Sequence, residues 1–346
     1  MAATEARAKP TLADIARITG VSAPTVSKVV NGRHDVAPET RAKVLAVLEQ
    51  TGYSSPVQRR SASPGPDMVE VVFDAFTSAY NTDVLTGILE SAAVQGVEIV
   101  LSVTGGGQPG AGSPERRAQR LLDEGRAGLI VVTSAFSEPQ LSAFRRRKIP
   151  VVVIDPLNPP PPDLVSVGAT NWAGGKAAAE HLLDLGHRRI AYLGGPEDAE
   201  CNQARLHGYL SALMSRGVPV EQDWIVHGQF RTEHGVEGLR ELLKRKERPT
   251  AIFAASDSIA VGVLREARRQ GVRVPDELSL VGFDGTAQAE DAVPALTSVS
   301  QPLQEMGRAA LRAVLRQARG EELDSHRVEL ATQLVVREST SAPPTP

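Results

Sequence analysis

Two series of apolar strands alternating with helices run through most of the chain, and this pattern constrains its fold more than any other feature. The first series has strands predicted near residues 69–73, 97–103, 128–133 and 150–154, and helices near 83–95, 114–124 and 138–147. The second has strands near 164–167, 189–194, 223–227, 250–254 and 278–283, and helices near 171–185, 203–216, 233–246 and 257–270. Short runs rich in Val, Ile and Leu between helices are typical of parallel sheets covered on both faces. We therefore predict an α/β body of two doubly wound lobes.

The first 62 residues differ in charge from the rest of the chain. They carry nine Lys or Arg and five Asp or Glu, a net charge of +4, whereas the remainder carries 29 basic and 36 acidic residues, a net charge of −7. A small basic segment on an acidic body indicates a polyanion as the partner of that segment.

Three short helices are predicted in this basic segment. The first begins after Thr11 and ends at Gly20, the second has Ser22 as its N-cap, and the third begins at Pro38. The apolar residues expected in their shared core are Leu12, Ile15, Ala16, Ile18, Val26, Val29, Val30, Val44, Leu45 and Leu48. The first two helices form a helix-turn-helix, which offers the N-terminal residues of its second helix to the major groove of DNA.

The basic segment resembles the DNA-binding head of the LacI/GalR family of bacterial transcriptional regulators. The resemblance rests on the run Thr11-Leu-Ala-Asp-Ile-Ala-Arg-Ile-Thr-Gly-Val-Ser-Ala-Pro-Thr-Val-Ser-Lys-Val-Val-Asn-Gly, followed by Thr40-Arg-Ala-Lys-Val and Gly52-Tyr53. It continues at lower density to Arg337-Glu-Ser-Thr. A three-helix bundle that contacts other proteins is the alternative reading of the same segment.

The resemblance implies roles for individual residues of the head. Contacts with the DNA backbone are implied for Thr11, Ser22, Thr25, Ser27 and Asn31. Base readout is implied for Ala23, Pro24 and Lys28. Because proline has no side-chain donor, hydrogen-bonded readout falls largely on the ammonium of Lys28, which either reaches guanine O6 and N7 or contacts a phosphate without specificity.

Residues 56–67 are rich in Pro, Ser and Gly and are predicted to link the head to the body. In relatives this stretch forms a hinge helix on DNA, from which a leucine enters the minor groove. The matching residue here is Ala62, which is too small to unstack base pairs. Arg59 and Arg60 either insert into a narrow minor groove or contact phosphates.

The resemblance also implies the organisation of the body. We expect a DNA-binding domain at residues 1–55, a two-lobed domain of the type-I periplasmic-binding-protein fold at 68–340 and a tail at 341–346. The chain is expected to cross between the lobes near residues 163, 291 and 324. Since nothing after Arg337 resembles a tetramerising heptad, a homodimer is the expected assembly.

Polar residues follow several of the predicted strands. In open α/β sheets, ligands bind beyond the carboxyl ends of the strands. Asp74, Asp155, Ser256, Asp257 and Asp284 all stand at such ends, so they are predicted to surround one cleft. The resemblance adds Arg205 as an effector-binding arginine and supports Asp284 as an acceptor.

Two aromatic residues complete the predicted effector site. Trp172 either stacks on the apolar face of a sugar or packs beneath a lobe, and Tyr80 is expected to line the other lobe. Two of the acidic candidates have alternative roles as well. Asp257 is either a ligand contact or a helix N-cap, and Asp155 before Pro156 can form an Asx-turn.

The predicted function is a sequence-specific DNA-binding regulator, released from a palindromic operator when a sugar or oligosaccharide binds the cleft. A regulator that uses a nucleobase or another small ligand as corepressor is the alternative. A sugar-active enzyme is disfavoured, because the sequence has no Ser/His/Asp spacing, Walker loop or metal triad.

Composition excludes several further classes of protein. The single cysteine, Cys201, cannot form an internal disulfide, and no zinc-ligand spacing occurs, so no cofactor is expected. The N-terminus lacks the apolar region of a signal peptide, and no stretch approaches the ~18 apolar residues that span a bilayer. A cytoplasmic location follows as the expectation.

Overall fold

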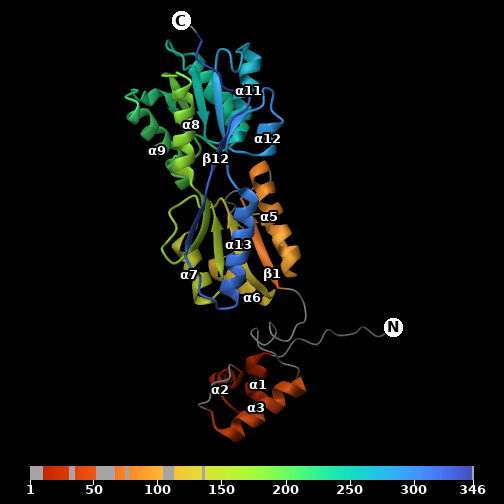
Figure 1. Ribbon diagram of the computed structural model, residues 1–346. Coiled ribbons are helices and arrows are strands. Elements are labelled where there is room, and N and C mark those ends of the chain that lie inside the picture. The colour runs from red at the N-terminus through yellow and green to blue at the C-terminus, as the bar shows by residue number, and fades with distance from the viewer. Residues whose placement is uncertain are drawn as a thin grey trace, which may run out of the picture. The chain divides into compact units, whose positions relative to one another are not determined.

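The computed structural model describes residues 11–30, 36–51, 67–74, 78–103, 113–134 and 137–344 (Figure 1). These residues separate into a helical N-terminal head and a larger α/β body. None of the helices in the described part of the chain is long and apolar enough to span a membrane.

Within the described residues, the head has three helices around a small apolar core, and their bounds are α1 Leu12–Thr19, α2 Ala23–Val30 and α3 Pro38–Thr51. The hydroxyl of Thr11 accepts from the Asp14 N–H at 3.3 Å, while the Asp14 carboxylate accepts from the Thr11 N–H at 3.0 Å, so α1 begins with a capping box. It ends at Gly20, whose φ of 66° lies in the left-handed region. The buried core residues are Ile15, Val26, Val29, Val30, Val44 and Leu48.

Two predictions for the core of the head were wrong. Ile18 is 51% exposed and Leu45 is 48% exposed, so neither belongs to the core. Each lies three residues from a fully buried residue, Ile15 in α1 and Leu48 in α3, but a helix advances about 100° per residue. Three residues along the helix, Ile18 and Leu45 therefore point about 60° away from these buried side chains, outside the face that packs in the core.

Lobe 1 of the body is built on a six-stranded parallel sheet in the order β11-β5-β4-β3-β1-β2. Its strands are β1 Met68–Phe73, β2 Glu98–Val103, β3 Arg126–Val132, β4 Val151–Ile154, β5 Val165–Ala169 and β11 Arg327–Leu330. Its helices are α5 Ala79–Gln95, α6 Pro114–Asp123, α7 Glu138–Arg146 and α13 Leu303–Ala318. Residues of α5 and α13 share one apolar core with the sheet, so a helix from near the end of the chain completes the first lobe.

Lobe 2 is built on a second six-stranded sheet, in the order β12-β10-β9-β8-β6-β7. Its strands are β6 Ile190–Leu193, β7 Ile225–Val226, β8 Ala251–Ala254, β9 Ser279–Asp284, β10 Thr297–Ser300 and β12 Gln333–Val335. Only β12 is antiparallel to its neighbour. The α-helices are α8 Asn171–Asp184, α9 Glu200–Ser215, α10 Thr232–Leu243, α11 Asp257–Gln270 and α12 Ala287–Glu290. The two doubly wound lobes predicted from the sequence are therefore confirmed.

The chain crosses between the lobes later than the sequence predicted. The strand predicted at 164–167 pairs with β4 of the first sheet, so the first crossing is at Thr170 rather than near residue 163. The second lies between β10 and α13, at Gln301 and Pro302, and the third at Ala331 and Thr332. The predicted positions near 291 and 324 lie in surface segments that precede β10 and β11. Each true crossing follows a strand directly, because the strands end at the boundary between the lobes.

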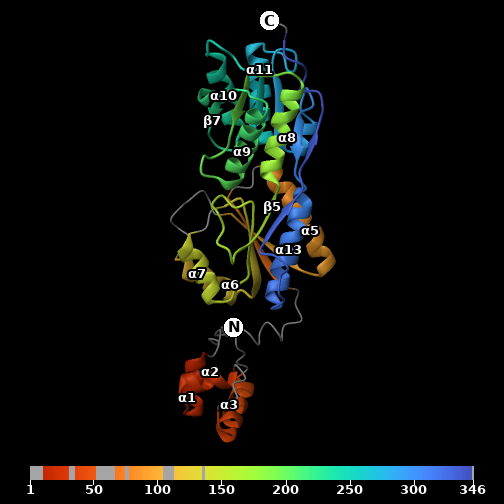
Figure 2. The same cartoon turned by 60° about the vertical axis from the view of Figure 1, so that its left-hand side comes forward.

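Helices α8 and α9 lie side by side in both views of lobe 2 (Figure 1 and Figure 2). A Cβ atom on Gly175 would lie 2.2 Å from the carbonyl oxygen of Arg205, and one on Gly208 would lie 2.1 Å from that of Trp172. Only glycine allows backbones to approach this closely. The two glycines thus fix the position of α9, which carries Arg205.

Candidate functional site

The described residues that are predicted to contact DNA lie on α2 and at the N-caps of α1 and α2. Thr11, Ser22, Ala23, Pro24 and Lys28 are exposed, while Thr25 and Ser27 are half-buried beside them. Ser22 caps the helix, since its hydroxyl accepts from the Thr25 N–H at 3.3 Å. The remaining DNA-contact candidates, Asn31, Arg59 and Arg60, lie outside the described residues, as does Ala62.

A cavity of about 170 Å³ opens at the carboxyl ends of strands from both lobes. Six of the eight residues predicted for the effector site line it, namely Asp74, Tyr80, Asp155, Arg205, Ser256 and Asp284. The sequence reasoning did not single out Phe230, Arg231 and Ser258, which also line the cavity. Phe230 and Arg231 stand in the loop between the strand predicted near 223–227 and the helix predicted near 233–246, but neither side chain is an oxygen acceptor of the kind expected at a strand end.

Strained backbone is concentrated at this cavity. Among the described residues, four that are not glycine have positive φ, and three of these, Thr133, Asp155 and Asp284, line the cavity. Their φ values are 49°, 43° and 111°. Such conformations cost energy in an L-residue and cluster at functional sites. The hydroxyl oxygen of Thr133, which also lines the cavity, is buried without a hydrogen-bond partner among the described residues.

Arg205 lies at the centre of the site and is only 3% exposed. Its Nε donates to Asn171 Oδ1 at 2.8 Å, and its Nη1 donates to the carbonyl oxygen of Ala255 at 2.6 Å. The guanidinium stacks on the ring of Phe283, with its carbon 3.8 Å from the ring centroid. These contacts hold the planar fork of Arg205 in one orientation toward the cavity.

Asp284 and Asp155 flank Arg205 from the two lobes. Asp284 Oδ1 lies 3.5 Å from Arg205 Nη1 and accepts from Gln301 Nε2 at 2.8 Å. Asp155 accepts from the Tyr80 hydroxyl at 2.7 Å. Burial raises the pKa of both carboxyl groups, that of Asp284 to about 8, and the positive charge of Arg205 opposes the rise. The charge of one guanidinium therefore favours the ionised forms of two buried carboxyl groups.

Gln301 was not predicted from the sequence. It occupies the second lobe crossing and is buried, and its N–H also donates to the carbonyl oxygen of Asp284 at 3.0 Å. The side-chain oxygen of Gln301 has no hydrogen-bond partner among the described residues. The acceptor Asp284 is thus tied directly to a segment that joins the lobes.

Two of the predicted effector residues do not line this cavity. Asp257 is buried behind Asp284, where its carboxylate accepts from the Thr286 N–H at 2.8 Å and from the Ser298 hydroxyl at 2.6 Å. It is not the N-cap of α11 either, because Ser256 accepts from the Ile259 N–H and caps that helix. Asp257 therefore binds the backbone after β9, and its own pKa is raised to about 6 by burial.

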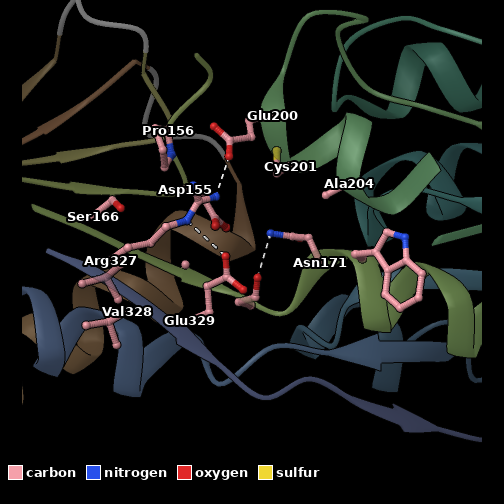
Figure 3. Close-up of a pocket in the computed structure, with 14 residues that line it drawn as sticks. Asp155, Pro156, Ser166, Asn171, Glu200, Cys201, Ala204, Arg327, Val328 and Glu329 are labelled. Atoms are coloured by element: carbon pink, nitrogen blue, oxygen red, sulfur yellow. Dashed lines mark hydrogen bonds and ion pairs between the residues drawn. The ribbon is translucent and has the colours of Figure 1, made fainter. Parts of the chain in front are cut away.

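Trp172 lines a second, smaller cavity of about 100 Å³, which Figure 3 shows. The side chain is 46% exposed, and Lys176 Nζ lies 5.8 Å from the centre of its ring. Asp155 and Cys201 line both cavities and form the wall between them. Stacking of Trp172 on a ligand in the larger cavity, as the sequence suggested, does not fit this placement.

The buried carboxyl groups predict an unusual dependence of stability on pH. A raised folded-state pKa means that Asp284 binds its proton more tightly in the folded state than in the unfolded state, where the pKa is about 4. Stability is then greatest at low pH within this window and falls as pH rises from about 4 to about 8. We expect Asp284→Asn to flatten this fall in the unfolding free energy, measured by urea titration from about pH 5 to about pH 8.

Asp324→Asn is the matched control for this experiment, since its carboxylate is 95% exposed. It should leave the pH dependence as in the unaltered protein. An Asp284→Asn protein whose stability falls as steeply with pH as that of the unaltered protein would contradict the assignment of this proton to Asp284.

No group of three or more His, Cys, Asp or Glu side chains in the described ranges is placed to hold a metal ion. The polar side chains that line the larger cavity instead carry two guanidinium groups, three carboxyl groups, several hydroxyls and two amides. This set suits a small organic ligand with several hydroxyl groups.

Comparison with known proteins supports both parts of this description. Residues 11–55 match the family described as "Bacterial regulatory proteins, lacI family", and residues 179–340 match the "Periplasmic binding protein-like domain". The chain is 33% identical over 342 residues to the HTH-type transcriptional regulator CelR of Thermobifida fusca, covering 97% of this chain and 99% of the relative. It is 32% identical to the catabolite control protein A of Priestia megaterium, covering 95% and 99%.

The solved structures agree with these matches. A structure titled "transcriptional regulator CelR-cellobiose complex" superposes with a TM-score of 0.71 at 32% identity, covering 95% of this chain and 99% of that chain. The lac repressor dimer bound to operator superposes with a TM-score of 0.70 at 24% identity and supports the fold alone.

A helix-turn-helix head on a two-lobed body with a polar cavity defines a DNA-binding transcriptional regulator that carries its own ligand site. The identities over nearly the whole chain then place it within one group of such proteins. The chain belongs to the lacI family of bacterial regulatory proteins.

Proposed function

We propose that this regulator represses transcription from a near-palindromic operator and is released when a carbohydrate binds the larger cavity. The observation that carries the proposal is the buried guanidinium of Arg205, which lies 3.5 Å from Asp284 and whose charge opposes the rise in the pKa of Asp155. Vicinal hydroxyls of a sugar donate to carboxyl oxygens and accept from a guanidinium fork, so this trio matches their hydrogen-bonding pattern. The relative CelR has been solved with cellobiose, which favours a disaccharide or longer glycan as the ligand.

The domain organisation proposed for this function follows the sequence. Residues 1–55 bind DNA, residues 56–67 link the head to the body, residues 68–340 hold the ligand and form the homodimer, and residues 341–346 are a tail. A dimer supports the proposal because a single head offers one short recognition helix, and two heads read two half-sites. The proposed cavity binds its ligand without turnover.

Titration of operator DNA with and without sugars tests this function. We expect a disaccharide such as cellobiose to weaken operator binding, and typical coupling free energies correspond to a change of roughly 5–150-fold in affinity. Tighter binding in the presence of the ligand would identify a corepressor system instead. Chemical conversion of the sugar by the purified protein would identify an enzyme.

Lys28 is proposed to read bases in each half-site. Replacing it with alanine should weaken binding to the operator by ~1–3 kcal/mol, because a bidentate contact with guanine is lost. Binding to random DNA should change less, and discrimination should relax at one position per half-site. Titrations with operator variants measure both effects.

Lys43→Ala on α3 removes the same charge from the head at another exposed site and serves as the matched control. It should leave base discrimination unchanged. Equal losses of Lys28→Ala on operator and random DNA would assign Lys28 to a phosphate contact.

A further inference from the structure

One ion pair joins the two lobes beside the smaller cavity (Figure 3). Arg327 lies at the start of β11 in lobe 1, and Glu200 is the first residue of α9 in lobe 2. Arg327 Nη2 donates to Glu200 Oε1, while Arg327 Nε donates to Glu329 Oε1 at 3.2 Å on its own strand. The guanidinium therefore bridges a carboxylate of each lobe.

Between pairs of described residues, no other ion pair connects lobe 1 to lobe 2. The Glu200 backbone N–H also donates to the carbonyl oxygen of Leu157 in lobe 1, at 3.2 Å. The second carboxylate oxygen of Glu200 is buried and has no partner among the described residues. Leaving a carboxylate oxygen unsatisfied is costly, so the contact with Arg327 is the main compensation that this carboxylate has.

The ion pair is close to both the hinge and the ligand site. Strand β11 runs from Arg327 to the third lobe crossing, where the Thr332 N–H donates to Thr170 Oγ1 at 3.0 Å and the Thr170 N–H donates to the Leu330 carbonyl oxygen at 2.9 Å. The first and third crossings are thus bonded to each other. The cavity beside the ion pair shares Asp155 and Cys201 with the larger cavity.

We propose that the Arg327–Glu200 ion pair is an electrostatic latch that holds the lobes in the arrangement seen here and thereby sets the ligand concentration at which the regulator responds. The inference rests on the proposed function of the larger cavity, whose lining comes from both lobes. A contact present in only one arrangement of the lobes shifts the balance between arrangements by its own free energy. Ligand affinity and operator affinity are then both changed by the latch, in opposite senses.

The strength of the latch depends on how exposed its two side chains are to solvent. The side chains of Arg327 and Glu200 are 58% and 25% exposed, so water and salt screen their attraction. Ion pairs of this kind change an equilibrium by roughly 2–5-fold. The contribution of the latch should decrease as salt concentration rises, whereas the hydrogen bonds at the crossings should persist.

A double-mutant cycle on the full chain tests the latch without ligand. Arg327→Gln, Glu200→Gln and the double variant are compared by hydrogen exchange of the peptides that contain Thr170 and Thr332. We expect each single change to accelerate exchange roughly 2–5-fold at low salt, and Arg327→Gln to have no further effect in a protein that already carries Glu200→Gln, because the contact is already lost there. The cycle also cancels the effect of Glu200 on the start of α9, which is additive.

Glu329→Gln is the matched control. Glu329 pairs with the same guanidinium of Arg327, but both residues of that pair lie in lobe 1. It should leave exchange at the crossings unchanged. Unaltered exchange in Arg327→Gln, or additive effects in the double variant, would overturn the latch. Operator binding is then titrated with cellobiose as a separate experiment. If cellobiose does not change operator binding by the unaltered protein, the proposed disaccharide ligand is contradicted, whereas the hydrogen-exchange result is unaffected.

Discussion

Replacing Arg205 with alanine is expected to abolish the response to the effector while operator binding in the absence of ligand persists. The guanidinium lines the cavity beside Asp284 and is held in one orientation by its other contacts, so its loss removes a fixed donor for the ligand. It also leaves Asp284 without its ion-pair partner and removes the stack on Phe283. Breaking a buried pair costs ~3–5 kcal/mol, which predicts a melting temperature lower by roughly 10 °C.

Operator titration with and without cellobiose and a thermal melt measure these two effects. Arg216→Ala is the matched control, because Arg216 directly follows α9 and pairs with Asp184 at the surface. It should change neither quantity appreciably. An Arg205→Ala protein that responds to the ligand with an unchanged midpoint would show that the ligand binds elsewhere.

Replacing Gly175 with valine is expected to destabilise lobe 2 severely. The new Cβ would lie 2.2 Å from the carbonyl oxygen of Arg205 and 2.8 Å from its carbonyl carbon and Cα, so only a shift of the whole α9 backbone can relieve the clash. Overpacking of a core costs ~1–3 kcal/mol or more when the neighbour is backbone. Because α9 carries Arg205, the effector response should be lost together with the stability.

Ala173→Val provides the comparison for this prediction, since Ala173 is exposed on the same helix. It introduces the same branched side chain and should cost less than ~1 kcal/mol. Urea unfolding of both variants measures the difference. Similar stabilities of Gly175→Val and Ala173→Val would mean that the two helices have room to separate.

The ring of polar residues around the larger cavity could be predicted because it depends on local patterns alone. Asp74, Asp155 and Asp284 each follow an apolar run, and parallel strands end at the same edge of a sheet. Ser256 follows the same pattern and also lines the cavity. Asp257, one residue further on, does not line it, because α11 begins there and the carboxylate accepts from the Thr286 N–H and the Ser298 hydroxyl instead.

The features that depend on pairing between distant segments could not be predicted in this way. The strand now assigned as β5 could join either sheet, and only its hydrogen bonds with β4 and β11 decide that it belongs to lobe 1. The contacts of Gln301 with Asp284 and of Arg327 with Glu200 likewise join residues far apart in the sequence. No spacing of residues in the sequence predicts such contacts.

Helix α13 has a consequence for how a cell makes this protein. Residues of lobe 1 occur in the first half of the body and again from Leu303 onward, and Leu303, Met306, Leu311 and Val314 are buried in the same core as β1 and α5. A ribosome therefore exposes the DNA-binding head long before lobe 1 can close its core, and domains fold as units during synthesis. A product terminated before residue 303 would leave apolar surface open on lobe 1 and become a target for proteases. Quality control would thus remove DNA-binding heads that are attached to an incomplete body.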